Sequence, residues 1–298
     1  MIDFIYSKLY SMKGKKGYLI IYRIVKLILN IYYPLHSKYS NREYNCKNEN
    51  VIISLTTFPA RINKVWLTIE SLMRQTVRPQ KIILWLAESQ FESRDELPKR
   101  LLALQKYGLE IKFCDDLRSH KKYYYSMLHH PEKIIVTVDD DTFYPESLLE
   151  NLLETHKKYP ESVCCNLAHA ITFKDGKINK YSEWKSGSDG VIGPSHNIMP
   201  IGCQGVLYPP NLLNENLFDK NQIKELCPLA DDIWLKAMAT INNVRTVKVN
   251  SNSITYVDII AFRDVSLTKV NVGQNLNDKQ IRAVLDRYPE VAMKWSQE

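Results

Sequence analysis

Four short apolar runs, separated by longer helical stretches, constrain the fold of this chain more than any other feature. The runs are rich in β-branched and aromatic residues: VIISL (51–55), KIILWL (81–86), LEIKF (109–113) and KIIVTV (133–138). Between them, apolar residues recur at helical spacing over 65–75, 97–107 and 123–129. Continuous apolar strands that alternate with helices are typical of a parallel sheet covered on both faces. We therefore predict an α/β fold with a mostly parallel sheet, whose ligands bind beyond the carboxyl ends of the strands.

The later part of the chain has looser patterns but the same character. Helical periodicity predicts helices over 146–159, from 231 onward and over 278–287, and β-rich runs predict strands over 162–167, 205–210 and 244–249. Asp175-Gly176 predicts a hairpin turn, and the Gly-, Ser- and Asp-rich stretch 184–199 predicts a mobile loop. We find no internal repeat, so we expect one body over 49–298, preceded by a separate segment, 1–48.

The N-terminal segment carries the net charge of the whole chain. Residues 1–42 contain eight basic side chains and one acidic one, Asp3, which accounts for the net charge of +7. The remaining body is balanced. A basic body would have suggested binding to nucleic acid, and this balance argues against that partner.

An apolar stretch in this segment, GYLIIYRIVKLILNIYYP (17–34), is just long enough to span a membrane. Arg23 and Lys26 lie in its middle, and each would cost roughly 3 kcal/mol inside a bilayer. We expect instead an amphipathic helix with a wide apolar face, ended by Pro34. It either lies on an anionic membrane, helped by Lys13, Lys15 and Lys16, or packs on the body or on a second subunit.

The cysteine pattern argues against two kinds of structural site. The six cysteines show no CxxC spacing, which argues against a structural zinc site, and they are too few for a disulfide framework in a chain of this length. We expect buried cysteines in a reducing compartment, no secretory signal, and a cytoplasmic location, peripheral at the inner face of the plasma membrane.

Three consecutive aspartates, Asp139, Asp140 and Asp141, follow the fourth apolar run. Like charges this close repel one another and raise each other's pKa. In a loop, such a run is usually a solvated turn or a helix cap. Directly after a buried strand, it favours a hard divalent cation, Mg²⁺ or Mn²⁺, together with substrate phosphates.

Four stretches occur in an order that resembles the nucleotide-sugar glycosyltransferases of the GT-A fold. They are VIISLTTFPARI, IIVTVDDDTFYP, GCQGVLYPP and LADDIWLKAM. The chain looks most like the family-2-type bacterial enzymes that build capsule, lipopolysaccharide or other surface glycans. The resemblance covers roughly residues 50–250.

The resemblance implies roles on the side of the sugar donor. VDDD matches the DxD motif, so Asp139 and Asp141 would hold the metal, with Asp139 also near the donor ribose and Asp140 at the more variable middle position. The other implied donor-binding residues are Thr56, Phe58 and Arg61 around the nucleotide, Asp116 at the base, and Lys121 or Lys122 at a phosphate.

On the acceptor side, the resemblance implies that Asp232 is the catalytic base, with Asp231 beside it as a modulator or a helix N-cap. Trp184 is the candidate for a lid over the sugar, and Gly202 and Gly205 would let the backbone approach it closely. Two family features are missing, a late histidine ligand and a QxxRW motif. The second absence argues for transfer of a single sugar.

These roles imply metal-dependent, inverting transfer of one sugar from a nucleotide-diphosphate sugar to a glycan or lipid-linked glycan. Two alternatives stay open. A sugar-phosphate nucleotidyltransferase would use a similar sheet, but SLTTFPARI lacks the Gly-rich loop typical of those enzymes. A non-catalytic, membrane-associated glycan-binding protein would not need Asp139, Asp141 and Asp232, and all three are present.

Overall fold

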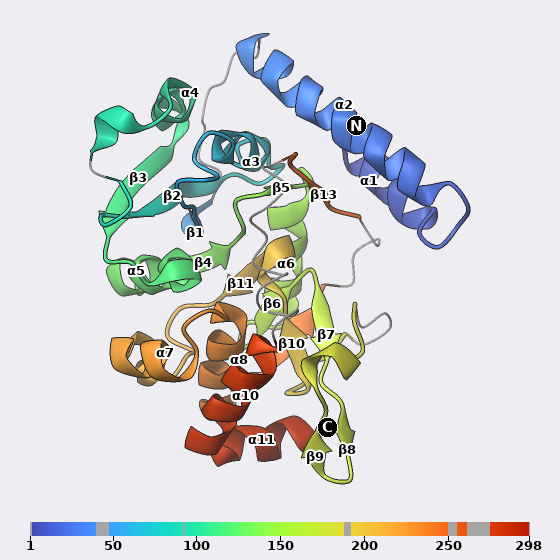
Figure 1. The fold of residues 1–298 in the computed structure, drawn as a ribbon, viewed down its shortest axis with the longest axis vertical. Helices are drawn as coiled ribbons and strands as arrows, with labels where there is room; N and C mark the ends of the chain where they lie inside the picture. The colour runs from blue at the N-terminus through green and yellow to red at the C-terminus, as the bar shows by residue number, and fades with distance from the viewer. Residues whose placement is uncertain are drawn as a thin grey trace.

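A seven-stranded sheet lies at the centre of the molecule, in the order β12-β6-β11-β4-β1-β2-β3 (Figure 1). This computed structural model describes residues 2–39, 48–91, 93–187, 192–249, 255–260 and 275–297. The strands are β1 (Asn48–Thr56), β2 (Pro79–Ala87), β3 (Leu109–Cys114), β4 (Ile134–Thr137), β6 (Val163–Cys165), β11 (Val206–Tyr208) and β12 (Thr246–Lys248). Within this sheet β11 alone is antiparallel to its neighbours. The predicted α/β class with a mostly parallel sheet is confirmed.

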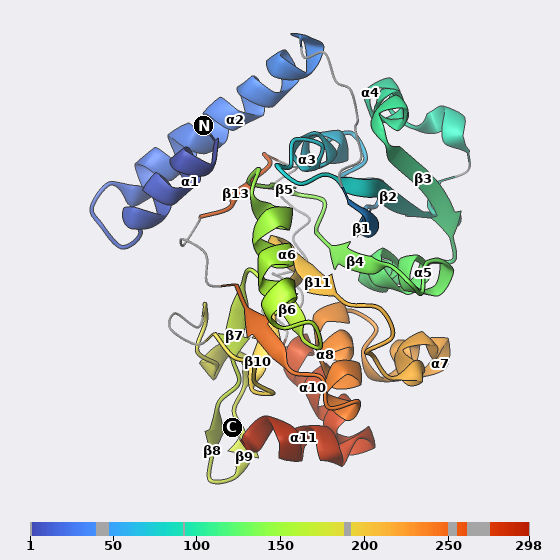
Figure 2. The same cartoon turned by 180° about the vertical axis from the view of Figure 1, so that it is seen from behind.

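Alternating side chains of the strands belong to two hydrophobic layers, one on each face of the sheet. Ile53 and Leu55 belong to the layer under α3 (Val65–Leu72) and α6 (Leu148–Lys158), which crosses β6 and β11 in Figure 2. Ile52 and Ile83 belong to the other layer. The helices over that layer are α5 (Lys121–His129), α8 (Asp231–Ile241), α10 (Leu276–Arg287) and α11 (Pro289–Ser296). Because both faces are covered, the central strands are apolar throughout.

Smaller elements complete the body. The helix expected over 97–107 divides into α4 (Lys99–Leu102) and a 3₁₀ turn, η2 (Ala103–Tyr107), which ends at Gly108 in the left-handed region. The hairpin turn at Asp175-Gly176 is confirmed between β8 (Phe173–Lys174) and β9 (Lys177–Ile178). The other elements are η1 (Arg94–Glu96), η3 (Arg118–His120), β5 (Thr142–Phe143), β7 (Ala168–Ala170), η4 (Tyr181–Glu183), β10 (Ile198–Pro200), η5 (Gly202–Gln204), η6 (Glu215–Phe218), α7 (Lys220–Leu226) and β13 (Val257–Asp258).

The mobile loop expected over 184–199 is partly wrong. Trp184 is only 4% exposed, and its indole Nε1 donates to the main-chain oxygen of Asn179. Ile198 and Met199 are buried in β10, which pairs with β7. The polar composition of the stretch concealed these anchors, and a buried Trp184 cannot act as a lid. Residues 188–191 lie outside the described part of the chain.

Two helices, α1 (Ile2–Ser11) and α2 (Tyr18–Tyr39), form an N-terminal hairpin against the body (Figure 1). Their buried side chains, Ile2, Tyr6, Leu9, Leu29 and Tyr33, join the same hydrophobic layer as β1. By length and composition, α2 is the one helix in the described residues that could cross a membrane; 11% of its apolar window is buried.

The prediction that Pro34 ends this helix is wrong, because α2 continues to Tyr39. Proline removes one intrahelical hydrogen bond and crowds the preceding turn. Next to Pro34, the Tyr33 ring stacks on Phe143 with centroids 4.7 Å apart, and the rings of Tyr32 and His36, one on each side of the proline, have centroids 5.0 Å apart.

Candidate active site

The three aspartates lie where β4 ends at the carboxyl edge of the sheet, and each has different surroundings. Asp140 points inward and is 7% exposed. Its carboxylate accepts hydrogen bonds from Thr57 Oγ1 and from Arg61, at 2.6 Å, and its main-chain oxygen accepts one from Thr68 Oγ1. Asp140 therefore joins the loop after β1 to α3 and to the end of β4.

Asp139 and Asp141 point outward on either side of Asp140. Their side chains are 35% and 33% exposed, so both carboxylates reach solvent. Asp141 lies 2.8 Å from Arg61, but burial and the neighbouring Asp139 still raise its pKa to about 6. Asp139 lies 2.9 Å from the Nζ of Lys122, at the first turn of α5.

Lys122 connects this edge to the start of α8. Its Nζ lies 2.8 Å from Asp231 Oδ2, and its side chain is 5% exposed. Burial alone would lower the pKa of Lys122, but Asp139, Asp231 and Asp232 raise it well above its usual value. The ammonium group is therefore charged and bridges two carboxylates that are far apart in sequence.

Asp231 and Asp232 begin α8 and have opposite electrostatic surroundings. Burial would raise the pKa of Asp231, but Lys122 and His120 hold it below its usual value. Burial and the ionised Asp231 raise the pKa of Asp232 to about 7. Asp232 Oδ2 accepts the main-chain N–H of Gly202 at 2.9 Å, whereas Oδ1 has no hydrogen-bond partner among the described residues.

Gly202 packs so closely on that carboxylate that a side chain at this position has no room. A Cβ at this position would lie 2.8 Å from Asp232 Oδ1 and 3.0 Å from Lys122 Nζ, closer than real Cβ atoms approach such neighbours. The Gly202 main chain therefore approaches the Asp232 carboxylate more closely than a residue with a side chain could.

The remaining predicted residues lie along the same edge but outside this ion-pair chain. Asp116 follows β3 and pairs with Lys121, whose side chain is 3% exposed. Thr56 Oγ1 donates to the main-chain oxygen of Trp85. Phe58 lies under the guanidinium of Arg61, 5.3 Å from the ring centroid. Of the two lysines predicted as possible phosphate ligands, Lys122 pairs with Asp139 and Asp231, whereas Lys121 pairs with Asp116.

Sequence reasoning missed several supporting residues. Thr57 and Thr68 hold Asp140, and the Tyr144 hydroxyl accepts the N–H of Asp139 and donates to Cys203 O. Burial lowers the pKa of His120 to about 4, so this side chain is neutral at pH 7. The only signal for Thr57 and Tyr144 was their position within the quoted stretches VIISLTTFPARI and IIVTVDDDTFYP.

The electrostatic balance of the site suits a cation. Five carboxyl groups, those of Asp139, Asp140, Asp141, Asp231 and Asp232, lie here, and in the described part of the chain only Arg61 and Lys122 form ion pairs with them. The described residues hold no cluster of three or more metal-binding side chains. Two outward carboxylates do fit Mg²⁺ or Mn²⁺, which commonly takes one or two carboxylates and completes its shell with water and phosphate.

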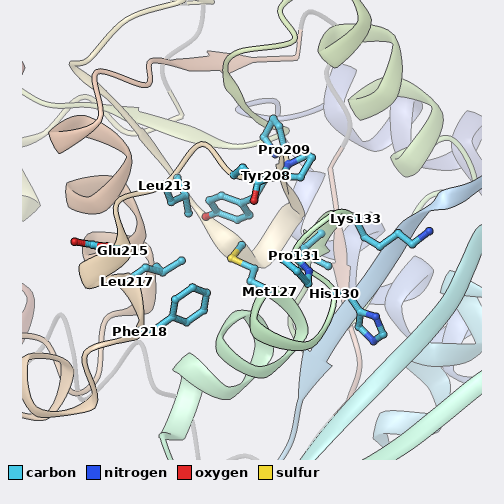
Figure 3. A pocket seen from close by; sticks show the side chains of 13 residues that line it. Met127, His130, Pro131, Lys133, Tyr208, Pro209, Leu213, Glu215, Leu217 and Phe218 are labelled. Carbon is cyan, nitrogen blue, oxygen red and sulfur yellow. The ribbon is translucent and has the colours of Figure 1, made fainter.

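A cavity of about 270 Å³ lies elsewhere, beside the C-terminal end of α5 (Figure 3). Met127, Leu217, Phe218 and Tyr208 line it, together with Ile135 near the start of β4. The aspartates follow the opposite end of β4, so this apolar cavity is separate from the candidate site.

Comparisons with known proteins give little beyond this geometry. No protein-family profile and no curated protein sequence matches the chain. Among solved structures, a mannosyltransferase from Pyrobaculum calidifontis in complex with GDP-mannose and Mn²⁺ aligns with 92% of this chain and 84% of its own. The identity is 11% and the TM-score 0.45, a likeness that assigns neither a family nor a function to the chain.

Proposed function

We propose that the protein is a metal-dependent glycosyltransferase that moves one sugar from a nucleotide-diphosphate sugar to a glycan or lipid-linked glycan acceptor, with inversion. The setting we propose is bacterial surface-polysaccharide synthesis of the capsule or lipopolysaccharide type, at the cytoplasmic face of the membrane. One observation carries the proposal: Lys122 bridges Asp139 of the DxD-like run and Asp231, beside Asp232, whose Oδ1 has no hydrogen-bond partner among the described residues.

On the donor side, Asp139 and Asp141 would hold Mg²⁺ or Mn²⁺. When bound, the ion neutralises charge that develops on the leaving diphosphate. Arg61 and Lys122 flank these carboxylates, and both carry positive charge that a phosphate can share. Asp140 fixes the direction of Arg61, and Phe58 covers the other side of the guanidinium. Thr56, Asp116 and Lys121 extend this edge toward β3, where the nucleoside would lie.

On the acceptor side, Asp232 would take the proton of the attacking hydroxyl. A base with a pKa of about 7 is partly ionised at neutral pH and accepts a proton readily. Gly202 N–H holds Oδ2 and leaves Oδ1 free for the hydroxyl. Lys122 keeps Asp231 ionised, which favours proton capture by Asp232. A single base opposite the leaving group is what in-line displacement with inversion requires.

Asp232 also bears on the two alternatives. A nucleotidyltransferase joins a sugar phosphate to a nucleotide, and its attacking phosphate is already ionised and needs no base. A glycan-binding protein has no use for a carboxyl group whose pKa is raised by desolvation, which costs stability. The raised pKa of Asp232 therefore favours, over both alternatives, a reaction in which a neutral hydroxyl attacks and gives up its proton.

The test is calorimetric titration with a panel of nucleotide sugars, with and without Mn²⁺, followed by transfer assays. We expect one donor to bind only with the cation. Asp141→Asn should abolish cation-dependent donor binding, whereas Asp232→Asn should keep it and lower transfer by about 10² to 10⁴-fold. Absence of nucleoside-diphosphate binding with any divalent ion would refute the proposal.

A further inference from the structure

The outer face of α2 exposes an almost unbroken row of large apolar side chains. Its members, Leu19, Ile20, Ile24, Leu27, Ile28, Ile31 and Leu35, are each between 51% and 66% exposed. Arg23 is the one charged side chain among them, and Phe4 of α1 is also 65% exposed. Exposed apolar patches of this kind mark interaction surfaces.

The opposite face of the same helix is already bound to the body. Leu29 and Tyr33 are buried, and Tyr33 stacks on Phe143. Tyr22 and Lys26 bond the carboxylate of Asp258, and Asn30 Oδ1 accepts the N–H of Ile260. The helix is thus apolar on two faces, and one of them has no cover among the described residues.

The charges around the outer face identify what covers it. Lys13, Lys15 and Lys16 are exposed in the turn between α1 and α2, and Arg23 lies within the apolar row. The sequence has no acidic residue between Asp3 and Glu43. Asp3 itself accepts the N–H groups of Glu146 and Ser147 before α6. None of these four cations forms an ion pair with an acidic side chain in the described ranges. Apolar side chains edged by such cations are complementary to an anionic lipid surface.

We propose that the outer face of α2 binds an anionic lipid bilayer, with the helix axis parallel to the membrane. A spanning orientation would strip Leu29 and Tyr33 from the body and place Arg23, Lys26 and Asn30 in hydrocarbon, each at a cost. An interfacial orientation keeps the inner contacts and buries only the exposed row. This inference does not rest on the proposed function.

The test is sedimentation of the full chain with vesicles of phosphatidylcholine, with and without phosphatidylglycerol. We expect salt-sensitive binding to the anionic vesicles. Leu27→Glu with Ile31→Glu should lower the partition coefficient by about ten-fold or more. The matched control, Leu128→Glu with Met293→Glu, changes side chains that are 47% and 57% exposed on α5 and α11, and it should leave binding unchanged.

Several results would overturn the inference. One is wild-type protein that stays in the supernatant with both kinds of vesicle, and another is equal loss of binding in both variant pairs. A dimer that forms without lipid and is broken by Leu27→Glu would make the face a contact between copies. Resistance of the membrane-bound protein to alkaline carbonate would make α2 a span. Thermal melting of each variant confirms that it is folded, and donor binding without vesicles tests the enzyme separately.

Discussion

Asp139, Asp140 and Asp141 are adjacent in sequence, yet their carboxylates have three different environments. Like charges at a strand end are tolerated because Arg61 neutralises the inner one and Lys122 holds Asp139. The sequence predicts this cluster and its place at the sheet edge. It could not separate Lys121 from Lys122, because neighbouring residues on a helix point about 100° apart and only packing sets which one faces the site.

The raised pKa of Asp232 predicts the pH dependence of transfer. A base works when ionised, so kcat/KM should rise with pH through about 7 and then level off. Lys122 lowers this pKa and Asp231 raises it. Lys122→Met should therefore move the rising limb to higher pH, and Asp231→Asn should move it to lower pH. Initial rates measured across pH values check this; equal shifts in the same direction would contradict it.

We predict that sugar transfer requires glycine at position 202, because a side chain there would displace Asp232 Oδ1 or the ammonium group of Lys122. Gly202→Ala places a Cβ 2.8 Å from Oδ1 and 3.0 Å from Lys122, at a backbone angle that any residue can adopt. The carboxylate or the ammonium group must shift, and a displacement of about 1 Å costs on the order of 10²-fold in rate. We expect transfer to fall with the melting temperature nearly unchanged. Unchanged transfer would mean that Oδ1 is not the acceptor of the proton.

At the scale of elements, the sequence predicts the recurring strands, and it misses features that depend on contacts with residues distant in sequence. The four parallel strands begin and end within three residues of the expected runs, because continuous apolar, β-branched runs between helices are typical of parallel strands buried on both faces. The antiparallel direction of β11 was not predictable, since GVLYPP is as apolar as its neighbours. Pro34 was misjudged because Phe143, on which the preceding Tyr33 stacks, is distant in sequence.

The start of α6 is predicted to depend on α1. Asp3 accepts the N–H groups of Glu146 and Ser147 at 2.7 and 3.0 Å, and a carboxylate there also favours the helix dipole. Asp3→Ala should lower the free energy of unfolding by about 0.5 to 2 kcal/mol and speed amide exchange in α1. Asp3→Asn keeps an acceptor and should lose less. Equal losses in both variants would show that the contact acts only through charge.

At the scale of the whole molecule, the N-terminal hairpin packs on β5, the short strand that directly follows Asp141 of the candidate site. Phe143 lies two residues after Asp141 in β5; Tyr6 donates to its main-chain oxygen, and Tyr33 covers its ring. On the other edge of β5, β13 pairs with it and Ile259 N–H bonds Asp141 O. The division into residues 1–48 and 49–298 follows the composition of the sequence and stays a prediction. In space the first segment shares a core with the second.

This continuity predicts that an inner-face change in α2 affects the site, whereas an outer-face change does not. Tyr33→Ala removes a buried ring that stacks on Phe143, and it should lower the free energy of unfolding by about 3 to 5 kcal/mol. With β5 loosened, cation affinity at Asp141 should fall as well, measured by Mn²⁺ titration at a temperature where the variant is folded.

Two controls separate packing from other effects. Tyr33→Phe keeps the ring and removes a hydroxyl that has no hydrogen-bond partner among the described residues, so stability should be unchanged or slightly higher. Ile31→Ala, on the exposed face, should leave both stability and Mn²⁺ affinity near wild type. If Tyr33→Ala lowers stability but leaves Mn²⁺ affinity intact, the hairpin supports the fold alone, and its contact with β5 does not position Asp141.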